Sequence, residues 1–482
     1  MNNYSTYLKP RFSILVLFIF VGFGNLSAQT KQWTLEECIN HALENNISIQ
    51  QSEFQLQLAE QNTKQAKYSN LPTLNGFASH TYNFGQTIDP FTNQFATSQV
   101  RSNSFSLSSS LTIFSGFQTL NTVKRNQADA KASEYDLQKM QNDVSLNIAN
   151  FYLQILFSNE LVKNSQNQLQ VTKGQIDRIA KMVEAGSLPE GNLREIEAQY
   201  ATEELQLINA QNSLSITKLN LAQVLRLEDA SNFEVVTPNL SSFQGVSELI
   251  TPGALYLTAL ETMPEVKSAE LSYYSAEKSK DIAQGGYSPT LSVTGSIGSG
   301  YSGANTEIVG VENQRLVRTG DVTEVSGEAI LSPAFDLIRE DKAFADQLDD
   351  NFNKSIGFRL NIPILNGFNS RINVQRAKIQ VEQAQLNLDN TKLQLRQNIE
   401  SAHNEAIAAL KRYRAAEKSV NALQLSFNYT KQRFDVGLLN SFDFNNEKNR
   451  LNNAESELLQ AKYEYIFKTK VLDFYQGKAL NF

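Results

Sequence analysis

Two long segments without proline constrain the fold of this chain more than any other feature. Residues 117–185 and 368–436 each run for 69 residues without a proline, and apolar residues recur in both at coiled-coil spacing. At ~1.5 Å per residue, a helix of this length extends roughly 100 Å. Such helices lie far outside the range found in globular proteins. The sequence therefore predicts an elongated helical rod.

Short glycine motifs mark both ends of each long segment. A glycine that follows a helix commonly supplies a left-handed C-cap, and a shorter helical segment of about 36 residues returns after each of these glycines. Corresponding motifs lie 251 residues apart, which predicts an internal two-fold repeat. The motifs are Ala185-Gly186 and Val436-Gly437 at the turns, and Gly116-Phe117 and Gly367-Phe368 at the helix starts.

Four segments with period-two alternation precede the long helices. They cover residues 74–84, 102–113, 291–297 and 356–364, and serines and threonines line one side of most of them. Each is about ten residues long, which is the length of a tilted membrane-spanning strand. Alternation alone is also compatible with any half-buried antiparallel sheet.

Four strands are too few to enclose a lumen. A barrel with room inside takes at least about eight strands, and open sheet edges do not occur in lipid. Several chains must then share one barrel, and three chains would supply twelve strands. The predicted fold class is a mixture of all-α and transmembrane β structure. Each chain would supply long α-helices that form a rod, and four β-strands to the shared barrel.

The chain begins with a segment typical of secretion signals. Lys9 and Arg11 precede an apolar run and small residues that end at Ala28, which predicts a signal peptide over residues 1–28. The remaining domains are expected at 29–227 for the first repeat, 228–252 for a linker at mid-helix, and 253–482 for the second repeat. The opening helices are expected at 34–70 and 255–288. An acidic insertion at about 301–351 is expected to be a loop at the far end of the barrel.

Composition argues against several function classes. The net charge of -7 disfavours a nucleic-acid partner, and the single cysteine, Cys38, permits no intramolecular disulfide. The three histidines are scattered, and no glycine-rich phosphate loop follows a strand. We therefore expect neither an enzyme nor a bound metal or cofactor.

Several of these motifs occur together in one known family. The chain resembles the TolC family of outer-membrane channel proteins along nearly its whole predicted mature length. The resemblance rests on the order and spacing of the following stretches: Trp33-Thr34-Leu35-Glu36-Glu37-Cys38, Ala42-Leu43-Glu44-Asn45-Asn46, Leu71-Pro72-Thr73-Leu74, Ser288-Pro289-Thr290-Leu291, the two Gly-Phe pairs, and Phe434-Asp435-Val436-Gly437 with Asp443.

The resemblance implies a location, partners and a gate. The protein would be a homotrimer in the outer membrane of a Gram-negative bacterium, in contact with lipid and extending into the periplasm. A long α-helical coiled-coil barrel would continue into a twelve-stranded trimeric outer-membrane barrel, to which each chain contributes four strands. A periplasmic adaptor and an inner-membrane pump would dock at the tips near Gly186 and Gly437. Asp443 matches a position that forms an acidic ring at the closed end of the tunnel, although it could also simply favour the start of a helix. Phe434 and Leu439 occupy latch positions, and Leu438 or Leu439 could close the pore by apolar contact.

These observations leave three functions open. The first is a passive exit duct of a tripartite efflux system, and the second is an exit duct for type I protein or polysaccharide secretion. The third is a periplasmic coiled-coil adaptor. Such an adaptor should have one helical hairpin between small β-domains, and not two repeats in each of which strands lead into a long helix.

Overall fold

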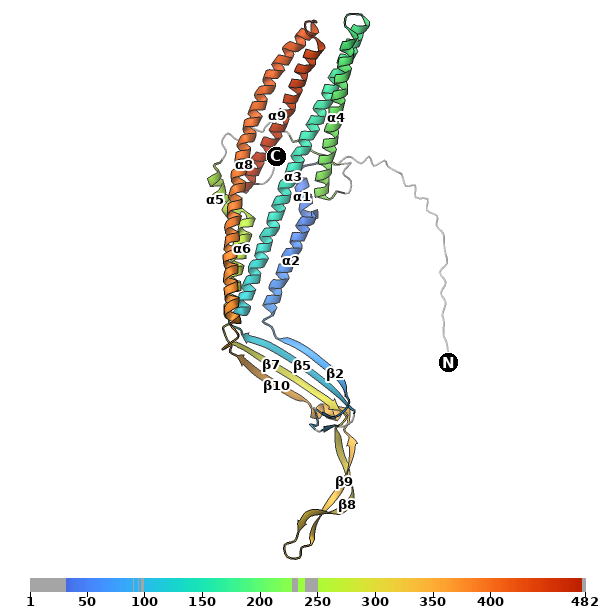
Figure 1. Cartoon of the computed structure of the whole chain (residues 1–482), viewed down its shortest axis with the longest axis vertical. Coiled ribbons are helices and arrows are strands. Elements are labelled where there is room, and N and C mark those ends of the chain that lie inside the picture. Colours follow the sequence, from blue (N-terminus) through green and yellow to red (C-terminus); the bar gives the residue numbers. More distant parts are fainter. Residues whose placement is uncertain are drawn as a thin grey trace, which may run out of the picture.

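The protein is an elongated molecule with helices at one end and strands at the other (Figure 1). The computed structural model describes residues 32–89, 91–93, 95–96, 99–227, 233–238 and 250–478. The proposed signal peptide, residues 1–28, and most of the proposed linker, residues 228–252, lie outside the described residues.

Two helical hairpins form most of the length, as predicted. The long helices α3 (Gln118–Glu184) and α8 (Asn369–Asp435) each contain 67 residues. They turn back into α4 (Glu190–Leu225) and α9 (Ser441–Tyr475). Elements of matching length thus occur in both halves of the chain, while the internal repeat stays a prediction.

The opening helices are each broken into two, which the sequence analysis did not foresee. In the first half α1 (Leu35–Asn45) ends at Asn46, whose side chain accepts hydrogen bonds from the first turn of α2 (Ile47–Tyr68). In the second half α5 (Pro252–Thr262) gives way to α6 (Pro264–Gly285) at a proline, which cannot donate the hydrogen bond that would continue a helix.

A four-stranded antiparallel sheet follows the opening helices. It consists of β2 (Thr73–Asn83), β5 (Val100–Phe114), β7 (Thr290–Ser302) and β10 (Asn353–Asn361), in the order β10-β7-β5-β2. The four predicted strands are confirmed, although the last ends three residues earlier than expected. Both edge strands, β2 and β10, have one side without a partner strand in this sheet.

The strand register separates polar from apolar side chains. Directly paired residues share one face of an antiparallel sheet. One face carries Leu74, Phe105, Leu107, Leu111, Val293, Ile297, Ile356, Phe358 and Leu360. The other face carries Thr73, Ser104, Ser106, Ser108, Ser110, Ser292, Thr294, Ser296 and Ser355. Exceptions include Phe77 on the second face and His80, Ser109 and Lys354 on the first. The predicted alternation therefore gives one mostly apolar face, suited to lipid, and one lined mostly by hydroxyl groups, suited to water.

The main apolar core lies halfway along the helices. There β1 (Gln32–Trp33) pairs in parallel with β6 (Glu234–Val235), and both pack against the middle of α3. The hydroxyl of Tyr152 on α3 donates to the carbonyl oxygens of Trp33 and Val236, at 3.2 and 2.6 Å. The described part of the predicted linker thus lies beside the middle of α3, while the linker itself stays a prediction.

The acidic insertion, expected as a loop whose own folding the sequence left open, contains regular structure. Most of it forms a long hairpin of β8 (Thr306–Val322) and β9 (Ala329–Asp341), followed by the short helix α7 (Phe344–Asp350). The shorter loop between β2 and β5 contains β3 (Thr87–Ile88) and β4 (Phe95–Ala96). As expected, these segments lie at the end of the sheet away from the helices (Figure 1). Among the described residues, no helix is both long and apolar enough to cross a membrane.

Candidate functional site

The two hairpin tips close with the same backbone geometry. Gly186 and Gly437 follow the long helices with φ angles of +73° and +76°, which favour glycine. The amides of Ser187 and Leu438 each donate to the carbonyl oxygen five residues earlier, at 2.9 Å. This is the hydrogen bond of a Schellman C-cap. The proposed docking residues Ala185, Gly186, Val436 and Gly437 are all exposed.

The return helices begin differently at the two tips. Pro189 is the N-cap of α4 and makes no side-chain cap, whereas Asn440 caps α9 by accepting from the amide of Asp443 at 2.8 Å. Asp443 is exposed and lies in the first turn of α9, where its negative charge interacts favourably with the helix dipole and stabilises the helix. The structure therefore supports the local role of Asp443, and its place in an acidic ring stays a proposal.

A groove of about 370 Å³ separates the two tips. Phe434, Leu438 and Leu439 line it from the second hairpin, opposite Met182 and Leu188 of the first. Three of the four predicted gate residues therefore lie together, while Asp443 is not among the residues that line the groove.

A further aromatic contact holds the second tip together. The ring of Phe434 on α8 stacks on Phe444 of α9, with ring centroids 4.5 Å apart. Phe444 is buried and also contacts Phe427, with ring centroids 5.4 Å apart. The latch position Phe434 therefore joins α8 to α9 within one hairpin.

An exposed ion pair joins the two hairpins beside this groove. The guanidinium of Arg178 on α3 donates to a carboxylate oxygen of Asp435 on α8 at 2.7 Å. The two side chains are 50% and 43% exposed, so water screens their attraction. In the sequence, Asp435 stands out only as part of the motif at the second tip, and no pattern marks Arg178.

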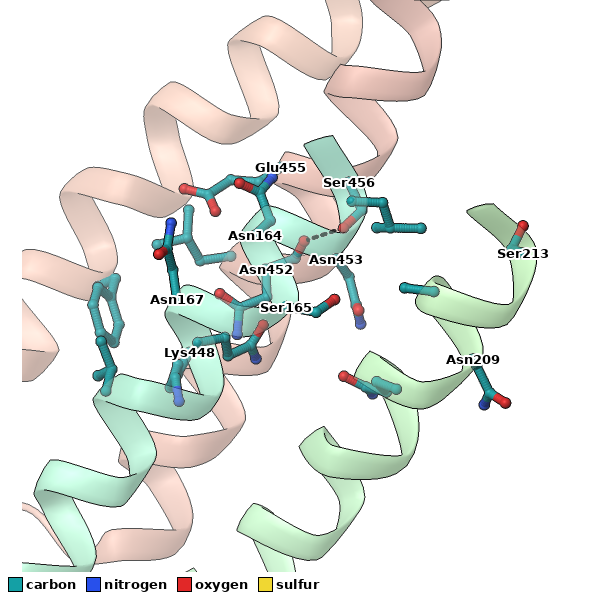
Figure 2. A pocket seen from close by; sticks show the side chains of 17 residues that line it. Asn164, Ser165, Asn167, Asn209, Ser213, Lys448, Asn452, Asn453, Glu455 and Ser456 are labelled. Carbon is teal, nitrogen blue, oxygen red and sulfur yellow. Dashed lines mark hydrogen bonds between the residues drawn. The ribbon is translucent and has the colours of Figure 1, made fainter. Parts of the chain in front are cut away.

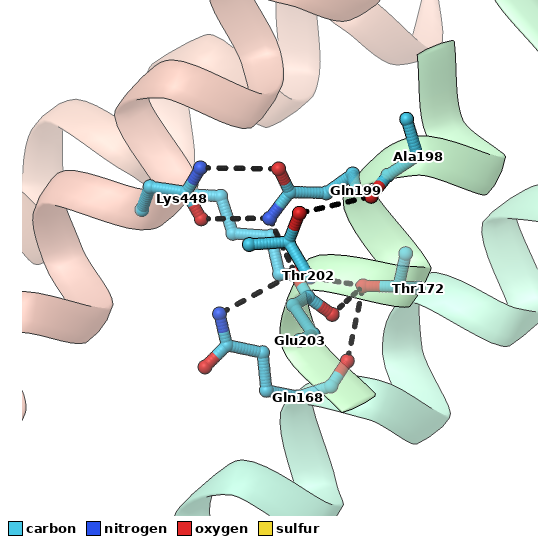
Figure 3. Close-up of polar contacts among 8 residues, drawn as sticks. Gln168, Thr172, Ala198, Gln199, Thr202, Glu203 and Lys448 are labelled. Carbon is cyan, nitrogen blue, oxygen red and sulfur yellow. Dashed lines mark hydrogen bonds and ion pairs between the residues drawn. The ribbon is translucent and has the colours of Figure 1, made fainter. Parts of the chain in front are cut away.

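A buried polar cluster connects the hairpins farther from the tips. Lys448 on α9 reaches Glu203 on α4 at 3.0 Å and also donates to the hydroxyl of Thr172 on α3 (Figure 3). Glu203 accepts further hydrogen bonds from Thr172, Gln199 and Gln168, the last two at 2.9 and 3.4 Å. We call Lys448, Glu203 and Thr172, which come from three helices, the inter-hairpin cluster.

Burial makes this cluster sensitive to the loss of a member. Lys448 is 4% exposed and Glu203 is 1% exposed. Burial lowers the pKa of Lys448, and the attraction of Glu203 acts in the opposite direction. Removing one partner would leave the other charge in a poorly solvated position.

Heptad spacing is the signal that could have revealed the cluster. Glu203 lies seven residues from the buried Ile196 and seven from the buried Ala210 on α4. Lys448 lies between the buried Phe444 and Leu451 on α9. Charged residues at such core positions indicate a specific buried contact.

A polar pocket of about 560 Å³ adjoins the cluster between α3, α4 and α9 (Figure 2). Amide and hydroxyl side chains dominate its lining, including Asn164, Asn167, Asn209, Asn452 and Ser456. Glu455 also lines it, and burial raises the pKa of this carboxyl group. Such a lining can hold water or polar groups by hydrogen bonding. Within the described part of the chain, no group of three His, Cys, Asp or Glu side chains could hold a metal ion.

The Gly-Phe pairs form the turns between strand and helix, as expected. Gly116 and Phe117 have φ angles of +62° and +61°, and Gly367 and Phe368 have +63° and +61°. A Cβ atom on Gly116 would lie 2.4 Å from Cβ of Ser288, whereas the nearest atom to one on Gly367 would be 3.8 Å away. The first turn therefore requires glycine for both conformation and space, and the second for conformation.

Together, the long helical hairpins, the two-faced sheet and the exposed glycine tips define an outer-membrane channel. The family model of the outer membrane efflux proteins matches residues 38–225 and 255–475. The chain belongs to this family, whose members are passive outer-membrane channels and not enzymes. The resemblance to the TolC family and the predicted location in the outer membrane are thereby confirmed.

Individual relatives agree with this family over most of the chain. The outer membrane protein TolC of Escherichia coli K12 is 23% identical over 472 residues, which are 95% of this chain and 84% of that protein. The structure of CusC covers 98% of this chain and 100% of its own at 15% identity, with a TM-score of 0.74. The open state of the MtrE channel of Neisseria gonorrhoeae covers 93% and 89% at 15% identity, with a TM-score of 0.68.

Proposed function

We propose that three copies of this chain form an exit duct through which an inner-membrane pump, joined by a periplasmic adaptor, expels its substrates. The observation that carries the proposal is the four-stranded sheet with one apolar face, one hydroxyl-lined face and two open edges. Open sheet edges do not occur in lipid, so we expect β2 of one copy to pair with β10 of the next. The hydroxyl-lined face would then surround a water-filled lumen.

The helices would continue this lumen through the periplasm. The hairpin tips are the part of the helical region farthest from the sheet (Figure 1). Their exposed turns, including Leu438 at 72% exposure, offer apolar contacts to an adaptor protein. We assign Gly186 and Gly437 to adaptor docking because they shape these turns.

The resting duct would be closed by the second hairpin. Leu438 and Leu439 would meet their counterparts from the other copies around the axis, and Asp443 follows in the first turn of α9. Three such carboxylates would favour cations at the constriction. Separation of the second hairpin from the first, with loss of the pair between Arg178 and Asp435, would widen the pore. A channel of this fold, MtrE, is known in an open state.

Single-channel recording in planar bilayers tests the proposal. Purified full-length protein should have the mass of a trimer and give small, cation-selective openings. Asp443→Asn should keep the trimer and reduce the preference for cations. Glu197→Gln, which neutralises an exposed carboxylate on α4 that pairs with Arg194, serves as the matched control for selectivity.

Each failure has a distinct meaning in this experiment. A monomer without conductance would contradict the duct. A conducting trimer whose selectivity is unchanged by Asp443→Asn would retain the duct and remove Asp443 from the gate.

A further inference from the structure

The β8–β9 hairpin projects from the rest of the protein without a supporting strand. Among the residues that the structure describes, the two strands pair only with each other, and the hairpin extends beyond the four-stranded sheet (Figure 1). A two-stranded hairpin alone is marginally stable in water, and packing on another surface is the usual remedy. A second surface is therefore needed to cover this hairpin.

One face of the hairpin is apolar. Five residues at alternate positions of β9 point to the same side, and three residues of β8 join them there through the strand register and its bulges. The members of this apolar hairpin face are Val311, Leu316, Val322, Ala329, Leu331, Pro333, Phe335 and Leu337. Arg318 pairs with Leu331 on this face, and Arg339 and Asp341 follow on the same side at the base of the hairpin. Leu316 is 64% exposed and Phe335 is 48% exposed, so the chain itself does not cover this face.

The opposite face carries four acidic residues, together with Val317, Ile330 and Ile338. Glu307 pairs with Glu340, and Glu312 pairs with Asp336, in the register of the two strands. Arg315 lies on the same side and is 3.4 Å from Asp336. Like charges opposite each other in a sheet are unfavourable unless water solvates them, so this face is expected to stay in water.

A packed base fixes the direction of the hairpin. Ser302, the last residue of β7, is fully buried and donates from its hydroxyl to the carboxylate of Asp89. Its amide donates to the side-chain oxygen of Gln347 on α7 at 3.0 Å. Asn351, which follows α7, donates to the carbonyl oxygen of Gly300 at 2.8 Å. The hairpin therefore starts from an ordered support at the rim of the sheet.

Other copies of this chain are the best candidates to cover the apolar hairpin face. The hairpin continues directly from β7 and leads through α7 into β10, and the open edges of the sheet require neighbouring copies in the proposed trimer. Each neighbour would hold an identical hairpin at the same rim. A lipid surface fits less well, because its phosphates would repel the acidic face that borders the apolar one.

The hairpin is long enough to reach its counterparts. Strands ~4.8 Å apart and tilted by ~40° give a twelve-stranded barrel a diameter of about 24 Å. The 17 residues of β8 extend roughly 55 Å at ~3.3 Å per residue. Each hairpin can therefore reach the barrel axis.

We propose that the three hairpins of the trimer pack their apolar hairpin faces together over the mouth of the barrel and form a cap there. This inference rests on the proposed trimeric duct. The acidic faces point outward to water, and the cap narrows the outer exit without any contribution from another protein.

Cysteine cross-linking tests the contact with a control one residue away. Leu316 lies on the apolar hairpin face, and its neighbour Val317 lies on the opposite face. The purified full-length trimer carrying Leu316→Cys or Val317→Cys is treated with a short bismaleimide. Cross-linked subunits should be several-fold more abundant for Leu316→Cys. The natural Cys38 is buried and present in both variants, so it cannot produce the difference.

Conductance provides a second measurement. Replacing residues 306–341 by a short Gly-Ser linker should leave the trimer intact and increase single-channel conductance, because the cap narrows the exit. An unchanged conductance together with equal cross-linking of the two cysteine variants would overturn the cap.

The native mass and a lipid probe separate the remaining outcomes. If the protein is a trimer but Leu316→Cys cross-links no more than Val317→Cys, the cap is contradicted and the proposed duct is not. If no trimer forms, both the cap and the proposed function are contradicted. Quenching of a fluorophore on Leu316→Cys by spin-labelled lipid would show that lipid covers the face, and would also overturn the cap.

Discussion

The two long helices are equal in length and capped alike, but they are buried very differently toward their tips. On α3, buried residues continue to Thr172 and Ile179. On α8, the whole of which the structure describes, no residue beyond Ala409 is buried within the chain. The tip half of the second hairpin is therefore joined to the first chiefly through α9 and through polar contacts. Such contacts can separate without exposing a large apolar surface.

The middle of the molecule is held together by apolar packing, whereas the tips are held by polar contacts. Tyr152, Phe233 and Ile466 belong to the large apolar core there, which joins elements of both halves. Near the tips, the inter-hairpin cluster and the pair between Arg178 and Asp435 replace such a core. We infer that the middle acts as a fixed joint and that the second hairpin moves about it.

The largest expected effect comes from breaking the inter-hairpin cluster on one side. Glu203→Leu leaves the charge of Lys448 buried without its carboxylate, and loss of one partner of a buried pair costs about 3–5 kcal/mol. We expect a lower free energy of unfolding and longer channel openings. Chemical denaturation followed by circular dichroism, together with single-channel recording, measures both.

A double variant and an exposed control sharpen this prediction. Glu203→Leu with Lys448→Met removes both charges and should recover most of the lost stability. Glu197→Gln alters an exposed ion pair with Arg194 on the same helix and should have little effect. A double variant as unstable as the single one would show that packing, and not charge, holds the hairpins.

The two strand-to-helix turns should respond unequally to alanine. Both glycines have positive φ, which costs another residue about 1–2 kcal/mol. Gly116→Ala also meets Ser288, and overpacking adds about 1–3 kcal/mol. Gly116→Ala should therefore lower the denaturation midpoint more than Gly367→Ala does. Equal losses would contradict the difference in packing between the two turns.

Removal of the exposed pair should change gating more than stability. Arg178→Gln breaks the contact with Asp435, and pairs this exposed contribute about 0–1 kcal/mol. The denaturation midpoint should hardly move, while openings in planar bilayers become more frequent. Lys181→Gln, on the same helix and one turn away, provides the control. Unchanged gating in Arg178→Gln would exclude this pair from the closed state.

The smallest expected effect is a pH dependence that arises from Lys448. Burial lowers the pKa of this amine below its ordinary value of 10.5, so the packed hairpins release the proton before separated ones do. Between the lowered pKa and 10.5, raising the pH should favour the packed, closed arrangement, and this contribution is lost as the pH falls. The difference between wild type and Lys448→Met isolates it. A difference of the opposite sign would show that the attraction of Glu203 outweighs burial, and would contradict a lowered pKa of Lys448.

The sequence predicted the parts of the fold that depend on regular spacing. Proline-free runs gave the long helices to within a residue at each end, and alternation gave the four strands of the sheet. The break between α1 and α2 at Asn46 was not predicted, because a single capping side chain interrupts an otherwise helical pattern. The β8–β9 hairpin was not predicted, because its bulges disturb the alternation of apolar and polar residues. The segment was therefore interpreted from its acidic residues, as a loop.

The candidate site was predictable only where backbone conformation decides it. Glycine turns at Gly186 and Gly437 follow from local chemistry, and the structure bears out their C-cap role. The pairing of Arg178 with Asp435 joins residues 257 apart, and that of Lys448 with Glu203 joins residues 245 apart. Such contacts depend on how two hairpins pack, which periodicity within one helix does not encode. Charges at heptad core positions were the available sign.

Single-channel conductance of the purified trimer, wild type beside Glu203→Leu, tests the central claim most directly. The claim is that polar contacts between the two hairpins keep this outer-membrane duct closed. We predict brief, small openings for the wild type and longer, larger openings for the variant, with partial return in Glu203→Leu/Lys448→Met. Identical recordings from all three folded trimers would contradict the claim.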